Sequence, residues 1–150
     1  EAAEFIARYF ERFPGIRDYV EGTKTFCREH GFVRTLFGRV CHYPGITSGN
    51  VSERTGVERQ AVNAPIQGTA ADIIRRAMIR MEGALADSGL SARMLLQVHD
   101  ELVFEVAEAE CADTARVVSD VMAGAAAPDI DLAVPLVVEA RSAENWERAH

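Results

Sequence analysis

Apolar residues recur along the chain with two spacings, one typical of helices and one typical of strands. Repeats of three and four predict helices over residues 1–13, 16–29, 57–87 and 108–127. Alternating or continuous apolar runs predict hairpins over 32–43 and 94–106 and a closing strand over 132–140. Pro14-Gly15 and Ser88-Gly89 are typical helix ends. This order predicts an α+β fold with helices packed on an antiparallel sheet.

The long helix predicted over residues 57–87 contains an internal proline, Pro65. Proline lacks the backbone N–H and clashes with the carbonyl group four residues earlier, so we expect a kink or a restart there. Two pairs of residues have the spacing of a capping box, Thr55 with Glu58 and Thr69 with Asp72. The pattern therefore predicts a helix start near each threonine.

The second predicted hairpin is largely apolar over residues 94–106, but its turn at residues 99–101 is His-Asp-Glu and contains no glycine. Alternation places Met94, Leu96 and Val98 on one face, and we expect both strands to be largely buried. Aspartate is a common turn residue, and the residues alone favour an ordinary turn. A hydrophobic hairpin would nevertheless hold a carboxylate in a fixed position, as a catalytic site requires.

Arg59, Asn63 and Gln67 are four residues apart and would lie along one stripe of the predicted helix. All three side chains can donate hydrogen bonds. The minor groove of a DNA duplex presents acceptors at every base pair, so a row of donors could recognise duplex shape without reading sequence. A solvated helix face is the more common explanation of such spacing, and Pro65 is expected to bend the stripe.

Composition limits the possible functions. Of the 150 residues, 48% are hydrophobic and 26% are charged, which is enough for a compact core. The net charge of −7 argues against a self-sufficient nucleic-acid-binding domain, although a site for divalent cations is itself acidic. The three cysteines are far apart, so we expect reduced, buried thiols and no zinc site. No apolar run is long enough to span a membrane, and no membrane partner is expected.

Other catalytic patterns fit this sequence poorly. His99-Asp100 resembles the His-Asp pair of one group of metal-dependent phosphohydrolases, which carry the pair on a helix together with further ligands. The segment 68–72 lacks the lysine and the glycine spacing of a phosphate-binding loop. Ser48 and Ser52 have no base near them in the sequence. A metal-dependent phosphohydrolase and a non-catalytic DNA-binding module remain the alternatives to an enzyme that acts on DNA.

Two segments taken together resemble the bacterial members of DNA polymerase family A. They are ERQAVNAPIQGTAADIIRRAM at residues 58–78 and QVHDELVFEV at residues 97–106. YFERFPGI, GFVRTLFGR and VPLVVEARSAENW resemble the same family in the same order, so the resemblance covers essentially the whole chain. It implies that residues 1–50 form the C-terminal end of the fingers subdomain, with helices and a small hairpin. Residues 51–150 would form the C-terminal part of the palm, with the catalytic hairpin.

The resemblance also implies a role for each candidate residue. Asp100 corresponds to the catalytic aspartate that binds two catalytic magnesium ions, and Glu101 corresponds to a supporting acidic neighbour. His99 corresponds to a residue near the primer terminus. The stripe of Arg59, Asn63 and Gln67 corresponds to residues that contact the primer–template, partly in the minor groove.

The implied reaction is template-directed transfer of a nucleotide from a dNTP to a primer 3′-hydroxyl, in gap filling and DNA repair. Two Mg²⁺ ions about 3.5–4 Å apart would stabilise the attacking and leaving oxygens. The resemblance implies that the second aspartate ligand lies upstream of the fingers, on another palm strand. The chain begins without methionine inside a helical pattern, so we expect a fragment of a longer protein. The expected partners are primer–template DNA, dNTP and the rest of the polymerase, namely the thumb, the fingers and the upstream palm strand. We expect a bacterial, nucleoid-associated cytoplasmic protein whose residues 1–150 are inactive alone.

Overall fold

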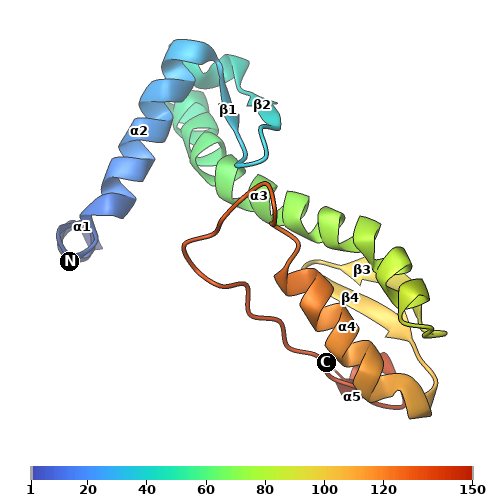
Figure 1. Cartoon of the computed structure of the whole chain (residues 1–150). Coiled ribbons are helices and arrows are strands. Elements are labelled where there is room, and N and C mark those ends of the chain that lie inside the picture. Colours follow the sequence, from blue (N-terminus) through green and yellow to red (C-terminus); the bar gives the residue numbers. More distant parts are fainter. Residues whose placement is uncertain (1, 150) are drawn as a thin grey trace. The chain divides into compact units, whose positions relative to one another are not determined.

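A computed structural model describes residues 2–149 of the chain, which form helices and two small antiparallel sheets (Figure 1). In chain order the main elements are α1 (Ala2–Arg12), α2 (Pro14–His30), β1 (Phe32–Arg34), β2 (Val40–His42), α3 (Val51–Asp87), β3 (Arg93–Val98), β4 (Glu101–Glu105), α4 (Cys111–Ala123) and α5 (Trp146–Ala149). Short 3-10 turns, η1 (Pro44–Thr47) and η2 (Glu108–Glu110), precede α3 and α4. The predicted α+β class is confirmed.

The chain divides into two compact units, an N-terminal unit over Glu1–Thr69 and a C-terminal unit over Ala70–His150. The helix α3 contributes residues to both. The predicted boundary between fingers and palm near residue 50 stays a prediction, because a division into compact units does not test it. In the part of the chain that the structure describes, no helix is long and apolar enough to cross a membrane.

In the N-terminal unit, α2 and the β1–β2 hairpin pack against the first half of α3. Gly31 ends α2 in the left-handed conformation (φ 75°), and its N–H donates to the carbonyl of Cys27. Such a C-cap favours glycine because a side chain is strained there. The hairpin pairs Phe32 with His42. Its inner side chains join a buried cluster of Cys27, Val33, Ile46 and Ala61.

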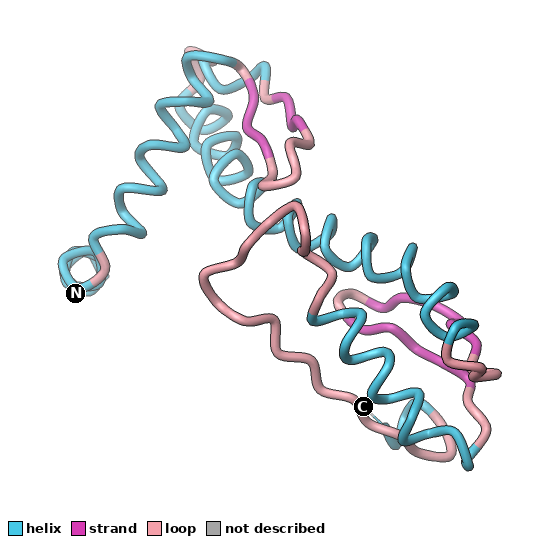
Figure 2. Tube along the Cα trace, viewed as in Figure 1, coloured by secondary structure: helices cyan, strands magenta, loops and turns pink. Residues whose placement is uncertain are grey.

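In the C-terminal unit, the second half of α3 and the helix α4 lie beside the β3–β4 hairpin (Figure 2). Their shared core consists of Met81, Leu85, Ala92, Val117 and Val118. Met94, Leu102, Phe104 and Val106 of the hairpin segment pack against this cluster. One face of the hairpin is therefore covered by helices, whereas Leu95 and Leu96 are exposed. The prediction that both strands are largely buried was wrong.

A β-bulge at Leu95 explains which side chains of β3 are exposed. Met94 pairs with Phe104, and the next pair is Leu96 with Val103, so Leu95 is an extra residue. A bulge of this kind shifts the alternation of faces by one position. Leu96 therefore lies on the face opposite to Met94, contrary to the prediction from simple alternation. Gln97, the partner of Leu102, takes the side of the sheet that faces the helices.

The helix α3 is continuous over its 37 residues and does not restart at Pro65 or Thr69. Its N-cap is Asn50, whose Oδ1 accepts hydrogen bonds from the backbone N–H groups of Ser52 and Glu53. Both predicted capping boxes were wrong, because Thr55 and Thr69 lie inside the helix. Their hydroxyls donate to the carbonyls four residues earlier, at 2.8 Å and 2.5 Å. Serine and threonine commonly make this bond when they lie inside a helix.

The segment after α4 differs most from the prediction. The helix ends at Ala123, four residues earlier than predicted, and residues 132–140 form no strand. Val134 and Val137 are 69% and 83% exposed. A strand needs a partner for its N–H and C=O groups, and Pro135 lacks one such donor. Each of the four described strands pairs only within its own hairpin, so this segment has no partner among them.

Candidate functional site

The predicted acidic turn lies at the tip of the β3–β4 hairpin. Val98 pairs with Glu101, so His99 and Asp100 form a two-residue turn between the strands. Both turn residues are exposed, as is Glu101. The Nε2 group of Gln97 donates a 2.7 Å hydrogen bond to the carbonyl of His99, which closes the turn from one side. The three predicted residues are thus brought together at one end of the hairpin.

His99 adopts a left-handed backbone conformation, with φ 52°, and is the only non-glycine residue of the described chain with a positive φ. Tight two-residue hairpin turns require positive φ, and glycine usually provides it. A non-glycine residue in this region costs on the order of 1–3 kcal/mol and persists where its surroundings hold it. The absence of glycine noted in the sequence therefore corresponds to a strained turn.

The hairpin holds this turn through apolar packing and one ion pair. Phe104 and Leu102 pack on the core of the C-terminal unit. At the end of the hairpin opposite the turn, Arg93 forms an ion pair with Glu105 on its partner strand. The predicted rigid support for a carboxylate is consistent with this packing.

The carboxylates of Asp100 and Glu101 suit a hard cation such as Mg²⁺, which binds oxygen ligands. Both belong to consecutive residues, and both are exposed, so a cation could approach them from solvent. Among residues 2–149, no three histidine, cysteine, aspartate or glutamate side chains come together as a metal site. The chemistry of these two carboxylates is compatible with a contribution to a magnesium site.

The predicted donor stripe lies on the exposed side of α3 in the N-terminal unit. Arg59, Asn63 and Gln67 are all exposed, whereas Ala61 and Thr69 on the same helix are buried. No partner among residues 2–149 is recorded for the three stripe side chains. Their donors are free to bind a ligand. The three residues lie on one continuous helix, as the spacing predicted.

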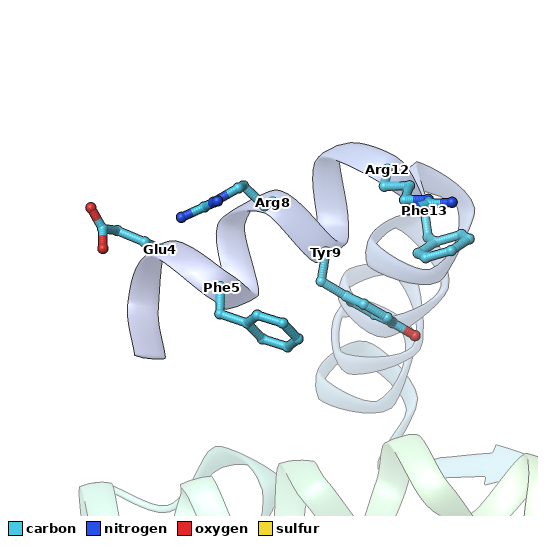
Figure 3. Close-up of a pocket in the computed structure, with 6 residues that line it drawn as sticks. All are labelled: Glu4, Phe5, Arg8, Tyr9, Arg12 and Phe13. Carbon is cyan, nitrogen blue, oxygen red and sulfur yellow. The ribbon is translucent and has the colours of Figure 1, made fainter. Parts of the chain in front are cut away.

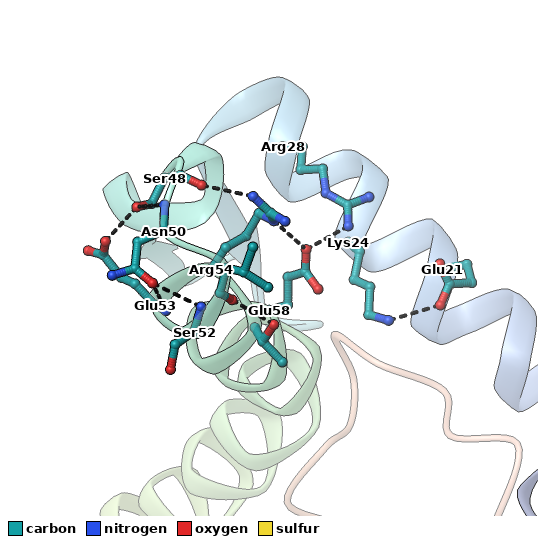
Figure 4. A network of polar contacts seen from close by, with 11 residues as sticks. Glu21, Lys24, Arg28, Ser48, Asn50, Ser52, Glu53, Arg54 and Glu58 are labelled. Atoms are coloured by element: carbon teal, nitrogen blue, oxygen red, sulfur yellow. Dashed lines mark hydrogen bonds and ion pairs between the residues drawn. The ribbon is translucent and has the colours of Figure 1, made fainter. Parts of the chain in front are cut away.

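A polar network holds the first turns of α3, which lead to Arg59 (Figure 4). Arg28 of α2 donates a 2.6 Å hydrogen bond to the carboxylate of Glu58. This bond lowers the pKa of the Glu58 carboxyl below its ordinary value, and nearby cations assist. Arg54 contributes to the same network by donating to the carbonyl of Ser48 at 3.0 Å. Sequence spacing did not indicate these contacts, because Arg28 and Glu58 are 30 residues apart.

Two arginines of α3 that the sequence analysis did not consider have a structural role in the C-terminal unit. Arg76 donates to the carbonyl of Ala125 at 3.0 Å and pairs with Asp129. Arg80 donates to the carbonyls of Gly124 and Ala127. These bonds satisfy backbone oxygens of the turns that follow α4. The sequence signal was an arginine pattern at i and i+4 on one helix face, which also occurs in many solvated helices.

The helix α1 presents a shallow pocket lined by Glu4, Phe5, Arg8, Tyr9, Arg12 and Phe13 (Figure 3). It contains none of the predicted site residues. Phe5 is 72% exposed, although the helical spacing of the apolar residues of α1 predicted an amphipathic helix.

The cysteines are free thiols, of which Cys27 is buried while Cys41 and Cys111 are half-buried. The prediction of full burial holds for Cys27 alone.

The His-Asp pair at residues 99–100 does not match the phosphohydrolase alternative. In that group of enzymes the pair lies on a helix, whereas here it forms a hairpin turn. This geometry removes the main reason for considering that alternative.

Comparison with known proteins gives a consistent result. A sequence model of DNA polymerase family A matches residues 1–148. DNA polymerase I of Rhizobium leguminosarum is 54% identical over 152 residues, covering 100% of this chain and 15% of that protein. DNA polymerase I of Pseudomonas aeruginosa is 50% identical over 150 residues, covering 100% of this chain and 16% of that protein.

A solved structure has the same fold. The POL domain of Pol1 from M. smegmatis, in complex with DNA primer-template and dNTP, matches with a TM-score of 0.92 and 43% sequence identity. The match covers 99% of this chain and 26% of that chain. The chain spans about 15% of the length of the curated relatives that it matches. The resemblance predicted from the sequence is confirmed, and this chain belongs to DNA polymerase family A.

Proposed function

We propose that the protein containing this chain is a template-directed DNA polymerase, which transfers a nucleotide from a dNTP to the 3′-hydroxyl of a primer. One observation carries the proposal: a chain of DNA polymerase family A exposes both a stripe of hydrogen-bond donors and a supported acidic turn. Its solved relative was captured with DNA primer-template and dNTP. Gap filling and DNA repair in the bacterial cytoplasm are the proposed settings for this activity.

The donor stripe on α3 is proposed to bind the primer–template. A guanidinium and two carboxamides present N–H groups at intervals of one helical turn. Acceptors at purine N3 and pyrimidine O2 occur at every base pair of the minor groove. Asn63 and Gln67 can therefore bind any correctly paired duplex there, and Arg59 can also pair with a phosphate. This mode of binding depends on duplex shape and not on sequence, as a polymerase requires.

The acidic turn is proposed to hold the catalytic metal ions. Asp100 would be a direct ligand of Mg²⁺, and Glu101 would support the same site. When bound, Mg²⁺ stabilises negative charge on the attacking and leaving oxygens of nucleotidyl transfer. His99 is adjacent to Asp100 in the turn and is proposed to lie near the primer terminus. The apolar strands keep these side chains at a fixed position at the tip of the hairpin.

Residues 1–150 are proposed to be insufficient for catalysis by themselves. Asp100 of the turn and Glu101, the first residue of β4, are the acidic residues at this tip of the hairpin, and a two-metal site needs ligands from more than one segment. We expect the purified chain to add no nucleotide in a templated primer-extension assay. Templated addition by this chain alone would overturn that proposal.

The decisive variant is Asp100→Asn in the whole polymerase. We expect primer extension to fall by at least about a thousandfold, as is typical when a metal ligand or a comparable catalytic group is removed. The affinity for primer–template should change little, because the donor stripe is intact. Asp113→Asn, at an exposed acidic residue of α4, is the matched control and should retain full activity.

Two outcomes would contradict the assignment. Retention of extension by Asp100→Asn would show that the turn is not catalytic and would favour the alternative of a non-catalytic DNA-binding module. Loss of DNA affinity in step with activity would indicate instead that the turn binds the duplex. Release of phosphate from nucleotides without a template would favour the phosphohydrolase alternative.

A further inference from the structure

The donor stripe spans the position in α3 where a proline removes one backbone hydrogen bond. Pro65 lies between Asn63 and Gln67 and has no N–H to donate to the carbonyl of Ala61. A proline inside a helix removes this bond and its ring clashes with the same carbonyl group, which commonly bends the helix. A change of bend at this point would move Asn63 relative to Gln67, although α3 remains continuous there.

Four carbonyl groups around Pro65 accept hydrogen bonds from side chains, three of which lie outside α3. The bonds are Tyr43 hydroxyl to Gln60 O at 3.3 Å, Tyr19 hydroxyl to Val62 O at 2.8 Å, Thr69 Oγ1 to Pro65 O at 2.5 Å and Arg39 Nη2 to Gly68 O at 3.2 Å. These carbonyls span the helix from just after Arg59 to just after Gln67. Side chains of α2 and of the β1–β2 segment are thus bonded to the backbone of the stretch that carries the stripe.

Thr69 makes the most specific of these contacts. Its side chain is 7% exposed, and its hydroxyl both donates to the carbonyl of Pro65 and accepts a 3.0 Å hydrogen bond from the N–H of Leu36. Leu36 lies in the turn of the β1–β2 hairpin. One hydroxyl therefore links that turn to the proline inside the helix.

Gly68 allows the hairpin turn to approach this closely. A Cβ atom at Gly68 would lie 2.6 Å from Cγ2 of Thr35, which is too close for two non-bonded carbon atoms. Thr35 is buried, and its Oγ1 accepts a hydrogen bond from the N–H of Arg39 at 3.1 Å, so it cannot easily move aside. The hairpin turn consequently packs against α3 at the residue that follows Gln67.

We infer that Thr69 and Tyr19, together with the β1–β2 turn, are positioning residues that fix the course of α3 around Pro65 and so align Asn63 with Gln67 for the duplex. This inference rests on the proposed function, because it assigns a role to residues that act through the stripe. It concerns residues that touch no nucleic acid themselves. Their effect is on the affinity for primer–template and not on the chemical step.

The test is Thr69→Val in the whole polymerase, which keeps the shape of the side chain and removes its hydroxyl. The KM for primer–template should rise about threefold to tenfold, the equivalent of one or two hydrogen bonds, while kcat at saturating DNA stays close to the original value. Thr69→Ser restores the hydroxyl and should restore KM. Thr55→Val is the matched control, since Thr55 bonds only the carbonyl of Val51 on an exposed part of the same helix.

A second variant keeps the inference testable if Thr69→Val unfolds the protein. Tyr19→Phe removes only the hydroxyl that donates to Val62 and should raise the same KM by about twofold to fivefold without altering the melting temperature greatly. An unchanged KM in folded Thr69→Val and Tyr19→Phe would overturn the inference. A fall in kcat of the same size as the expected rise in KM, with KM itself unchanged, would also overturn the inference.

Combination with Gln67→Ala separates the inference from the proposed function. If Thr69 acts through the stripe, the double variant Thr69→Val with Gln67→Ala should lose much less affinity than the sum of the two single losses. Additive losses would show that Thr69 does not act through Gln67. If Gln67→Ala and Arg59→Ala both leave primer–template binding unchanged, the proposed role of the stripe fails, whatever Thr69→Val does.

Discussion

The two units hold their candidate functional groups in different ways. In the C-terminal unit, the acidic turn projects from a hairpin whose inner face packs on apolar side chains such as Met81 and Val118. In the N-terminal unit, the donor stripe lies on a helix whose backbone accepts hydrogen bonds from Tyr19, Tyr43 and Arg39. An apolar core supports a short rigid turn well. A helix that lacks one internal hydrogen bond at a proline can be held there by directional bonds to its neighbouring carbonyls.

Charge separates the same two regions. Residues 1–69 contain nine lysines and arginines against eight aspartates and glutamates, whereas residues 70–150 contain seven against fifteen. The net charge of −7 thus comes from the unit with the acidic turn, which suits a cation site. The unit with the donor stripe does not repel a polyanion strongly. The net charge of the whole chain does not reveal this difference between the two units.

The largest expected effect is on the apolar support. Met81→Ala removes a fully buried side chain and should lower the free energy of unfolding by about 2–5 kcal/mol. Ile79→Ala, 71% exposed on the same helix, should change it by less than about 0.5 kcal/mol. Urea unfolding of the polymerase followed by circular dichroism measures both. Equal effects of the two variants would contradict the description of this core.

A smaller effect is expected on primer–template binding, and its salt dependence should distinguish the charged member of the stripe from the neutral ones. Arg59→Ala should weaken primer–template binding and lower the slope of log Kd against log salt concentration by about one, because one cation–phosphate contact is lost. Gln67→Ala should weaken binding with the slope unchanged. Fluorescence anisotropy with a labelled duplex at several salt concentrations provides the measurement. A slope that falls for Gln67→Ala but not for Arg59→Ala would reverse the two assignments.

The smallest effect concerns the ion pair at the start of α3. The hydrogen bond from Arg28 lowers the pKa of the Glu58 carboxyl below its ordinary value of 4.5. The pair should therefore stabilise the fold above pH 4.5, and this contribution should disappear as the pH falls through the lowered pKa. Since Arg28 is 43% exposed, we expect less than about 1 kcal/mol.

Glu58→Gln is the variant that tests this pH dependence. It should lower stability near neutral pH and have little effect once Glu58 is protonated, as measured by urea unfolding at several pH values. Asp18→Asn, in the exposed pair with Arg17, is the control. A stability loss from Glu58→Gln that is the same at all pH values would argue against the ion pair.

Local spacing predicted what depends on local geometry. The three-residue stripe on α3, the position of the hairpin turn near His99-Asp100 and the end of α2 before Gly31 follow from periodicity and turn residues. Two of the errors concern α3. Asn50 caps the helix in place of Thr55, and the helix continues through Thr69, where a restart was predicted.

Other errors come from features that leave no periodic signal. The bulge at Leu95 interrupts the alternation of the strand, so simple counting placed Leu96 on the wrong face. The apolar segment 132–140 has the composition of a strand, but none of the described strands pairs with it. The proposal that Asp100 is a metal ligand depended on resemblance to a family and not on the turn by itself, because acidic turns are common.

The extra residue in β3 determines where this hairpin can tolerate a change of length. Removal of Leu95 would leave Met94 opposite Phe104 and Leu96 opposite Val103, so the strands would form a regular ladder with the same turn. Removal of a residue between Leu96 and Val98 would instead invert the faces of part of the strand or change the turn. Deletion of Leu95 is therefore expected to shorten β3 while leaving Asp100 in the same turn.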